Sequence, residues 1–168
     1  MTLYIGMKQI LLFSLLLSCL GPVEAQETSS LQTYPDFDTF EKEVLQRNDG
    51  VTYVVNFWAT WCAPCVKELP YFYGIEDRFK DQNVKVILVS LDFKRQIDSK
   101  LKPFLEKHNI QNEVVVLLDG NSTSWIDKVD KNWSGAIPYT RVYNGSRNIG
   151  AERSFHSTDE IDNFIKSL

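Results

Sequence analysis

The sequence contains little glycine and proline, with 8 and 6 residues in a chain of 168, which excludes a collagen-like or low-complexity disordered protein. It also lacks an excess of positive charge, because 18 basic residues face 22 acidic ones and the net charge is −4. Such a chain offers no cationic field to phosphate backbones, so nucleic acid is not an expected partner. What remains is an ordinary globular composition, 43% hydrophobic and 24% charged, in a length that suits one domain.

Cysteine is scarce, and the three present are Cys19, Cys62 and Cys65. A disulfide-stapled scaffold needs several pairs that join distant parts of the chain, so this class is excluded. The Cys-x-x-Cys spacing of Cys62 and Cys65 is not half of a zinc site, because a second cysteine pair is missing and His108 and His156 lack the usual ligand spacing. An inert structural disulfide would close too short a loop to stabilise the fold much. The pattern therefore favours redox chemistry, and no metal is expected.

The apolar stretch at residues 10–20 (ILLFSLLLSCL) is too short to span a bilayer of about 30 Å. Lys8 precedes it, and residues 23–25 (VEA) supply the small side chains that a signal peptidase requires, so residues 1–25 are predicted to be a signal peptide. As an alternative, the residues ending at Cys19 resemble a bacterial lipobox, in which this cysteine would carry lipid. Both interpretations place the folded domain outside the cytoplasm, in a periplasm or cell envelope where disulfides can form.

The rest of the chain shows the hydrophobic patterns of one domain over residues 36–168, preceded by a polar segment at 26–35 that we interpret as a linker. Buried strands alternating with helices indicate a parallel sheet, to which a β-hairpin adds antiparallel strands. Pro103 is expected to kink its helix or to start a new one. The expected strands are 51–57, 84–91 and 114–118, the helices 36–47, 66–80, 97–108, 124–129 and one from Thr158 onward, and the hairpin 139–153 with its turn at Asn144-Gly145.

The cysteine pair lies where the first buried strand ends and the next helix begins. The first turn of a helix has unpaired N–H groups and the positive end of the helix dipole, and both favour a thiolate on Cys62. Pro64 suits this position because its missing N–H is no loss there. Cys65 is expected one turn further in, within reach of Cys62 for a reversible disulfide. Cys62 is therefore the predicted exposed nucleophile and Cys65 the buried resolving thiol.

Residues 54–70 (VVNFWATWCAPCVKELP) closely resemble the active-site segment of the thioredoxin-like family. The tail formed by Cys65, Glu68 and Pro70 is similar to that of TlpA/ResA-type extracytoplasmic thiol-disulfide reductases, and residues 136–140 (AIPYT) are similar to the cis-proline loop of that fold. The resemblance implies an α/β protein of the thioredoxin-like fold, a central mixed β-sheet flanked by helices. It also implies a protein-disulfide reductase that works without a cofactor, with cytochrome c maturation as one pathway.

The same resemblance assigns roles to single residues. It implies that Pro138 follows a cis peptide bond and that Ile137 lies beside the cysteine pair, where its backbone meets an extended substrate segment. It implies that Glu68 tunes the thiol pKa values and relays protons, because Asn56 stands where thioredoxin has a buried aspartate. Trp61, next to the first cysteine of the pair, is expected on an apolar rim where substrate docks.

The direction of the reaction is expected to be reduction. Ala63-Pro64, between the cysteines, adds neither charge nor a donor side chain, whereas strongly oxidising relatives such as DsbA have a histidine there. The expected partners are a disulfide-bearing protein as substrate and a thiol protein, including a membrane-embedded one, as electron donor. Two alternatives remain open. One is a peroxiredoxin-like peroxidase, and the other a copper-binding chaperone of the Sco type, which uses Cys-x-x-x-Cys with a distant histidine, for which His108 and His156 are available. A secreted eukaryotic isomerase is disfavoured because Lys166-Ser167-Leu168 is not a retention tail.

Overall fold

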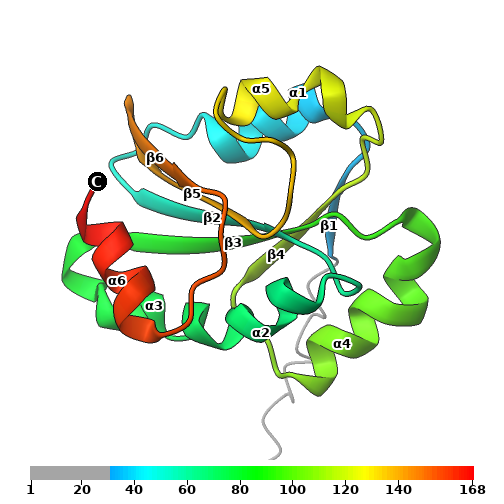
Figure 1. The fold of residues 1–168 in the computed structure, drawn as a ribbon, viewed down its shortest axis with the longest axis horizontal. Helices are drawn as coiled ribbons and strands as arrows, with labels where there is room; N and C mark the ends of the chain where they lie inside the picture. Colours follow the sequence, from blue (N-terminus) through cyan, green and yellow to red (C-terminus); the bar gives the residue numbers. More distant parts are fainter. Residues whose placement is uncertain (1–30) are drawn as a thin grey trace, which may run out of the picture. The chain divides into compact units, whose positions relative to one another are not determined.

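The computed structural model describes residues 31–168, which form one compact unit built on a six-stranded sheet in the order β1-β4-β3-β2-β5-β6 (Figure 1). The predicted signal peptide at 1–25 and Cys19 lie outside the described residues. The strands are β1 (Gln32–Tyr34), β2 (Thr52–Trp58), β3 (Val84–Ser90), β4 (Glu113–Leu117), β5 (Tyr139–Asn144) and β6 (Arg147–Ala151). β1, β4, β3 and β2 pair in parallel, whereas β5 and β6 add the antiparallel edge. This is the mixed sheet that the sequence predicts.

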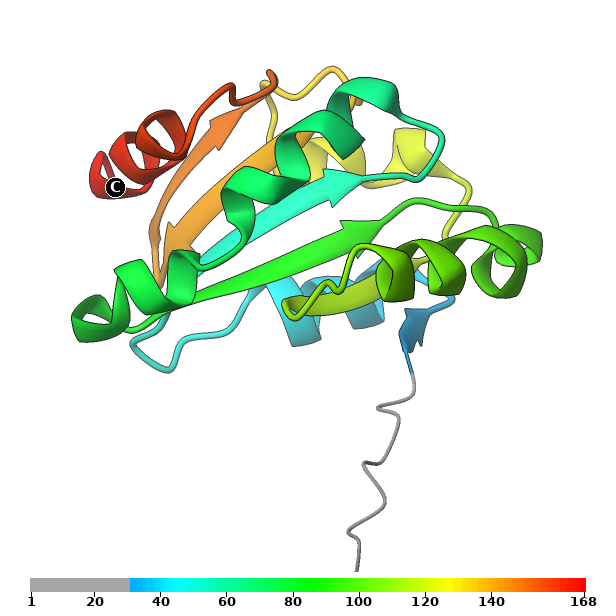
Figure 2. The ribbon, with the colours of Figure 1, turned by 90° about the horizontal axis from the view of Figure 1, so that it is seen from below.

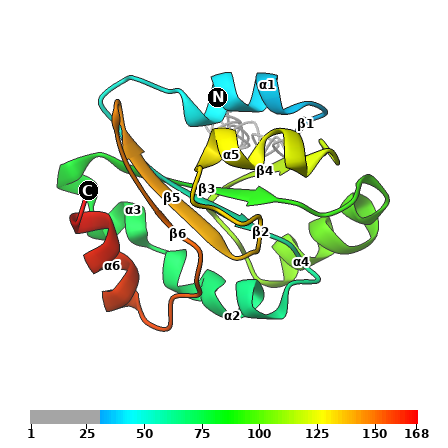
Figure 3. The ribbon, with the colours of Figure 1, turned by 45° about the horizontal axis from the view of Figure 1, so that its top comes forward.

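Helices cover both faces of the sheet, as Figure 3 shows. The α-helices are α1 (Phe37–Phe40), α2 (Ala63–Phe72), α3 (Ile75–Arg78), α4 (Lys102–Lys107), α5 (Ile126–Val129) and α6 (Thr158–Lys166). Shorter turns are the π-helical η1 (Glu41–Leu45) and η4 (Ile97–Leu101) and the 3-10 turns η2 (Lys80–Gln82), η3 (Lys94–Gln96) and η5 (Ser122–Ser124). One apolar core lies between the sheet and α2, α3, α4 and α6, and a second lies between the sheet and α1, η1 and α5. In residues 31–168, no helix combines the length and apolarity that crossing a membrane requires.

Strand β2 lies in the middle of the sheet, between β3 and β5, and contributes side chains to both cores. Val54 and Trp58 belong to the core under α2, whereas Val55 and Phe57 belong to the opposite core, as the two-residue period of a strand requires. Figure 2 shows α2 lying across this part of the sheet. The same alternation directs Asn56 towards α2, which becomes important for the site described below.

The predicted linker at 26–35 is wrong at its C-terminal end, because Gln32–Tyr34 forms an edge strand of the sheet. Gln32 pairs with Val115 and Tyr34 with Leu117 in parallel register. Tyr34 is buried and packs edge-on against Phe40. A three-residue strand with two exposed polar side chains is too short to show a hydrophobic period. This segment is a strand because it pairs with β4.

The helix predicted over 66–80 is also wrong in its extent. The side chain of Cys62 caps α2, which therefore begins at Ala63. The chain leaves this helix at Phe72, and Gly74 adopts the left-handed conformation, with φ of 70°, before the short helix α3. Only glycine adopts this conformation at no steric cost. The helix predicted over 97–108 is present as η4 followed by α4, and Pro103 lies in the first turn of α4, so the expectation of a new helix start is confirmed.

Candidate active site

The two cysteines lie at the N-terminus of α2, directly after β2, and are joined by a disulfide bond. Cys65 is completely buried and Cys62 keeps 6% of its surface exposed, so Cys62 is the outer member of the pair. The expectation that Cys62 is an exposed nucleophile is wrong in this oxidised state, because the disulfide and the packing around it leave only the edge of this residue at the surface. The backbone N–H of Cys65 donates to Cys62 Sγ at 3.3 Å. An N–H group and a helix N-terminus directed at this sulfur stabilise negative charge on it, which is the condition for a nucleophilic thiolate.

A buried carboxylate fixes the loop that leads to Cys62. Asp92, just after β3, accepts hydrogen bonds from Thr60 N at 3.0 Å and Thr60 Oγ1 at 2.5 Å. It also accepts from Ser90 Oγ at 2.8 Å and is 1% exposed. Trp58 pairs with Ser90 at the carboxyl ends of β2 and β3, which places the two loops side by side. Asp92 is not among the site residues predicted from the sequence, although an aspartate following a buried parallel strand is a signal for this position.

The cis-proline loop lies on the other side of the outer sulfur. The Ile137–Pro138 peptide bond is cis, which confirms the expectation from the resemblance. Cys62 Sγ lies 3.7 Å from the carbonyl oxygen of Ile137, so the expected neighbourhood of Ile137 and the cysteine pair is also observed. Trp133 holds the loop, since its Nε1 donates to Ala136 O at 2.7 Å. An extended chain lying beside Cys62 would meet backbone groups of this loop.

Glu68 lies in the core one helical turn after Cys65 and is 1% exposed. Its Oε1 accepts from Asn56 Nδ2 at 2.9 Å and its Oε2 from Phe155 N at 2.8 Å. Asn56 Nδ2 also donates to Thr140 Oγ1 at 3.0 Å, while Asn56 Oδ1 is buried without a partner. Burial raises the pKa of Glu68 to about 7, although the bonds from Phe155 and Asn56 and the charge of Arg153 act in the opposite direction. Glu68 can therefore exchange a proton near neutral pH.

Two aromatic side chains lie exposed beside the disulfide. Trp61 is 52% and Phe93 58% exposed, and their rings stack with centroids 6.4 Å apart and planes at 18°. Trp61 thus lies at the surface next to Cys62, as a docking rim requires, whereas Trp58 is buried against Phe104. Phe93 was not singled out from the sequence, because a lone aromatic residue in a loop carries no local signal of exposure.

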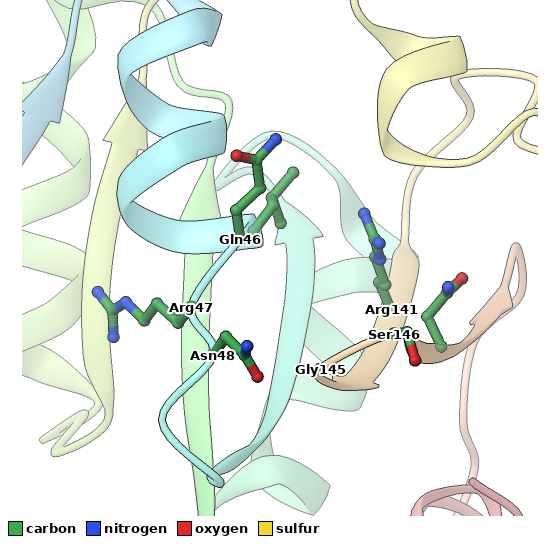
Figure 4. A pocket seen from close by; sticks show the side chains of 8 residues that line it. Gln46, Arg47, Asn48, Arg141, Gly145 and Ser146 are labelled. Carbon is green, nitrogen blue, oxygen red and sulfur yellow. The ribbon is translucent and has the colours of Figure 1, made fainter.

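An open cavity of about 380 Å³ lies at the other end of β2 and contains neither sulfur. Tyr53, near the start of β2, pairs with Tyr143, near the β5–β6 turn, whereas Cys62 follows the end of β2. Figure 4 shows side chains that line this cavity. Its lining residues are Leu45, Gln46, Arg47, Asn48, Arg141, Gly145, Ser146 and Asn148.

The two histidines considered for copper lie on other elements than the cysteine pair. His108, at the end of α4, stacks on Phe104 with centroids 4.3 Å apart. The backbone N–H of His156 donates to Glu160 at the start of α6. Across residues 31–168, no group of three or more His, Cys, Asp or Glu side chains is arranged to hold a metal ion.

Comparisons with known proteins agree with this geometry. The model of the AhpC/TSA family matches residues 30–151. The thiol-disulfide oxidoreductase ResA of Bacillus thuringiensis is 32% identical over 76 residues, which are 45% of this chain and 42% of that protein. The sporulation thiol-disulfide oxidoreductase A of Bacillus subtilis is 30% identical over 69 residues, 41% of this chain and 42% of that protein. The chain thus matches less than half the length of these curated relatives.

Solved structures share the fold. A DsbF homologue from Corynebacterium diphtheriae superposes with a TM-score of 0.56 at 17% identity, over 71% of this chain and 73% of that one. A thiol:disulfide interchange protein of the thioredoxin family from Chlorobium tepidum superposes with a TM-score of 0.52 at 24% identity, over 70% and 79%. At these identities the likeness shows the fold alone, a mixed sheet flanked by helices.

Proposed function

The chain belongs to the AhpC/TSA family of thioredoxin-like proteins, and from this premise we propose that it is a thiol-disulfide oxidoreductase that reduces disulfide bonds in other proteins. The observation that carries the proposal is the Cys62–Cys65 disulfide at the N-terminus of α2, with its outer sulfur 3.7 Å from the cis-proline loop. A dithiol in this position has one activated outer sulfur and one fully shielded sulfur, which is what a two-step exchange requires.

The reaction begins with the reduced pair. The Cys62 thiolate attacks one sulfur of the substrate disulfide, a Cys62–substrate bond forms, and the other substrate sulfur leaves with the electron pair and takes a proton from solvent. Cys65 then loses its proton and attacks Cys62 Sγ. The Cys62–Cys65 bond forms, and the second substrate sulfur leaves as a thiolate. Two electrons pass from the pair to the substrate, and a thiol protein of the same exchange chemistry must return them.

Glu68 is proposed to accept the proton that Cys65 loses in the second step, while Asn56 holds the Glu68 carboxylate in position. Cys65 is completely buried, so its proton cannot pass directly to water. Glu68 lies one turn further along α2 and has a pKa of about 7, so it is able to take up a proton at neutral pH. Asn56 holds one carboxylate oxygen in place. Trp61, Ile137 and Pro138 are proposed to contact the substrate chain.

Reduction, rather than oxidation, is the proposed direction. Ala63 and Pro64 contribute neither a charge nor a side-chain donor to stabilise the reduced thiolate further, and it is this stabilisation that makes DsbA a strong oxidant at about −120 mV. Titration of the Cys62–Cys65 couple against glutathione tests the direction. We expect a potential well below that of DsbA, and a value close to the DsbA end of the scale would refute the reductase assignment. Failure of the reduced protein to exchange with any disulfide would refute the function itself.

The proposed place of action is outside the cytoplasm, in a periplasm or cell envelope. Support comes from the apolar stretch at residues 10–20 and from the chemistry, because substrate disulfides form and persist in extracytoplasmic compartments. Mass spectrometry of the mature N-terminus tests this placement. A free Gln26 would indicate soluble export and a lipidated Cys19 would indicate an anchor, whereas an intact Met1 in exponentially growing cells would contradict both.

A further inference from the structure

Trp61 and Phe93 are the large apolar side chains that residues 31–168 leave exposed. They come from loops 32 residues apart, since Trp61 follows Thr60 and Phe93 follows Asp92. The two bonds from Thr60 to the Asp92 carboxylate join the residues that immediately precede the two rings. The stack of Trp61 on Phe93 is therefore held in position by a buried anchor. We call these two rings the aromatic platform.

Positive charge lies next to the aromatic platform. The guanidinium of Arg95 lies 5.5 Å from the centre of the Phe93 ring, and Lys94 and Lys67 are exposed. Residues 59–67 and 93–96 contain no acidic residue. Asp92 lies between these segments in space, but it is 1% exposed and its oxygens are occupied by Thr60 and Ser90. The next carboxylate along the chain, the exposed Asp98, is paired with Lys102, so the surface beside the aromatic platform has a local excess of positive charge in a protein of net charge −4.

The opposite side of the disulfide has a different character. There the cis-proline loop is bonded to an acidic side chain, because Ser134 N donates to Glu152 Oε2 at 2.8 Å. The outer sulfur thus lies between a backbone edge on one side and an apolar surface with cations on the other. A bound chain has a defined orientation in such a site, since its carboxylates are favoured only on the side of Arg95.

We propose that the aromatic platform and Arg95 form a docking surface for a polypeptide substrate that has an apolar side chain next to its disulfide cysteine and an acidic residue beyond it. The inference rests on the proposed function and adds the substrate class. The apolar side chain packs on the rings of Trp61 and Phe93, and the carboxylate pairs with Arg95 or Lys94. The backbone of the substrate then runs across Cys62 to the cis-proline loop.

The test uses synthetic peptides, each closed by one disulfide, and pre-reduced protein in single-turnover reactions that are quenched with acid and separated by chromatography. The first peptide has Phe beside its cysteine and Asp beyond it. The second has Ser in place of Phe, and the third has Lys in place of Asp. The small neutral disulfide of 2-mercaptoethanol serves as a reference, because it has neither an apolar side chain nor a charge for the surface to bind. The readout is each peptide's rate divided by the rate with this reference.

We expect the first peptide to react about tenfold faster than the second, the discrimination that one apolar side chain supplies in a pocket, and about threefold faster than the third, the size of an exposed charge pair. Phe93→Ser should remove the preference for Phe, and Arg95→Glu should remove or invert the preference for Asp. Lys42→Glu makes the same charge change on η1, against the other face of the sheet, and should keep both preferences. Phe93, Arg95 and Lys42 are all exposed, so these variants are expected to fold.

Equal rates for the three peptides, or preferences that survive in Phe93→Ser and Arg95→Glu, would overturn the docking inference and leave the oxidoreductase function intact. An effect of Lys42→Glu as large as that of Arg95→Glu would overturn the local role of Arg95. Absence of any reaction with the reference disulfide and with all three peptides would instead refute the proposed function, so the two failures are distinguishable.

Discussion

The side-chain amide of Asn56 donates to Glu68 Oε1 at 2.9 Å across the interface between β2 and α2. Both residues are buried, and Phe155 N donates to the other carboxylate oxygen at 2.8 Å. A carboxyl group enclosed in this way is stabilised in its neutral form, because the few bonds it receives do not replace the water it has lost. Because the pKa of Glu68 is about 7, the charge of this buried group changes near neutral pH.

Glu68→Gln should change the pH dependence of stability. The pKa of Glu68 is raised from 4.5 to about 7 in the folded protein, so between these values the folded state binds the proton more strongly than the unfolded state. The free energy of unfolding therefore falls as pH rises from about 4.5 to 7, by about 3 kcal/mol at about 1.4 kcal/mol per pH unit. In Glu68→Gln this slope should disappear, so the variant gains stability relative to the native protein as pH rises.

Denaturant unfolding of the oxidised protein at pH 5 and pH 8 measures this difference. Asn56 Oδ1 is unpartnered, so rotation of the Asn56 amide offers an acceptor to the NH₂ group that the substitution introduces, and the variant should fold. Parallel stability curves for the native protein and the variant would show that Glu68 does not titrate in this range.

The reactivity of the outer thiol should depend on the same carboxyl group. As Glu68 ionises around pH 7, its charge disfavours a second anion nearby, on Cys65 one turn away on α2 and on Cys62 at the N-cap of this helix. Alkylation of Cys62 by iodoacetamide should therefore increase over a broad pH range in the native protein. In Glu68→Gln it should follow one titration with a lower midpoint. Glu106→Gln, at an exposed position of α4, is the matched control. An unchanged profile in Glu68→Gln would remove Glu68 from the mechanism.

The parts of the fold that the sequence predicts are those with dense local patterns. β2 and β3 are buried on both faces, so their residues are almost all apolar and are easily identified. The N-terminus of α2 is marked by a capping side chain and a proline within a few residues. By contrast, β1 depends on pairing with Val115 and Leu117, and a segment of three residues, two of them polar and exposed, does not indicate that pairing. The helix break after Phe72 depends on Gly74 alone. The residues on both sides of it have a helical pattern, so the sequence predicts one continuous helix.

The candidate site likewise has residues that the sequence predicts and residues that it does not. Cys62, Cys65 and Glu68 lie within one helix and its cap, so their relation follows from helical spacing. Phe155, whose N–H donates to Glu68, is 87 residues from Glu68 along the chain. Asp92, which accepts from Thr60, is 32 residues from Thr60. These partners meet only because the sheet brings the carboxyl ends of β2 and β3 together and places the chain after β6 beside α2. Contacts of this range leave no periodic trace in a single sequence.

Asp92→Ala should destabilise the fold and loosen the loop before Cys62. The substitution leaves Thr60 N, Thr60 Oγ1 and Ser90 Oγ without their acceptor, and we expect a loss of about 3 kcal/mol in the free energy of unfolding. Asp98→Ala removes a carboxylate that is 85% exposed and paired only with Lys102, and should cost less than about 0.5 kcal/mol. Denaturant unfolding of both variants gives the comparison. Equal and small losses would show that Asp92 does not hold the loop.

Gly150→Ala should destabilise β6 for a steric reason. A methyl group at this position would overlap Tyr139 Oη and Asp130 Oδ2, which are hydrogen-bonded to each other at 2.7 Å. The pair must separate or the strand must shift, at a cost of about 2 kcal/mol. At Gly120, an added methyl group meets no atom within 4 Å, so Gly120→Ala should change stability by less than about 0.5 kcal/mol. Thermal unfolding compares the two, and a Gly150→Ala protein as stable as the control would disprove the overlap.

Cys65→Ala should trap the intermediate of the proposed reaction. With the inner thiol removed, Cys62 can still attack a disulfide, but nothing in the site can release it, so a mixed disulfide should accumulate. In Cys62→Ala the remaining thiol is completely buried in the structure and should form little adduct. Intact-protein mass spectrometry after incubation with the disulfide of 2-mercaptoethanol measures the adduct, and a reductant should remove it. Both variants retain Cys19, so the difference between them isolates the site. Equal trapping by the two variants would contradict the assignment of Cys62 as the nucleophile, because it would mean that the outer position at the start of α2 confers no advantage.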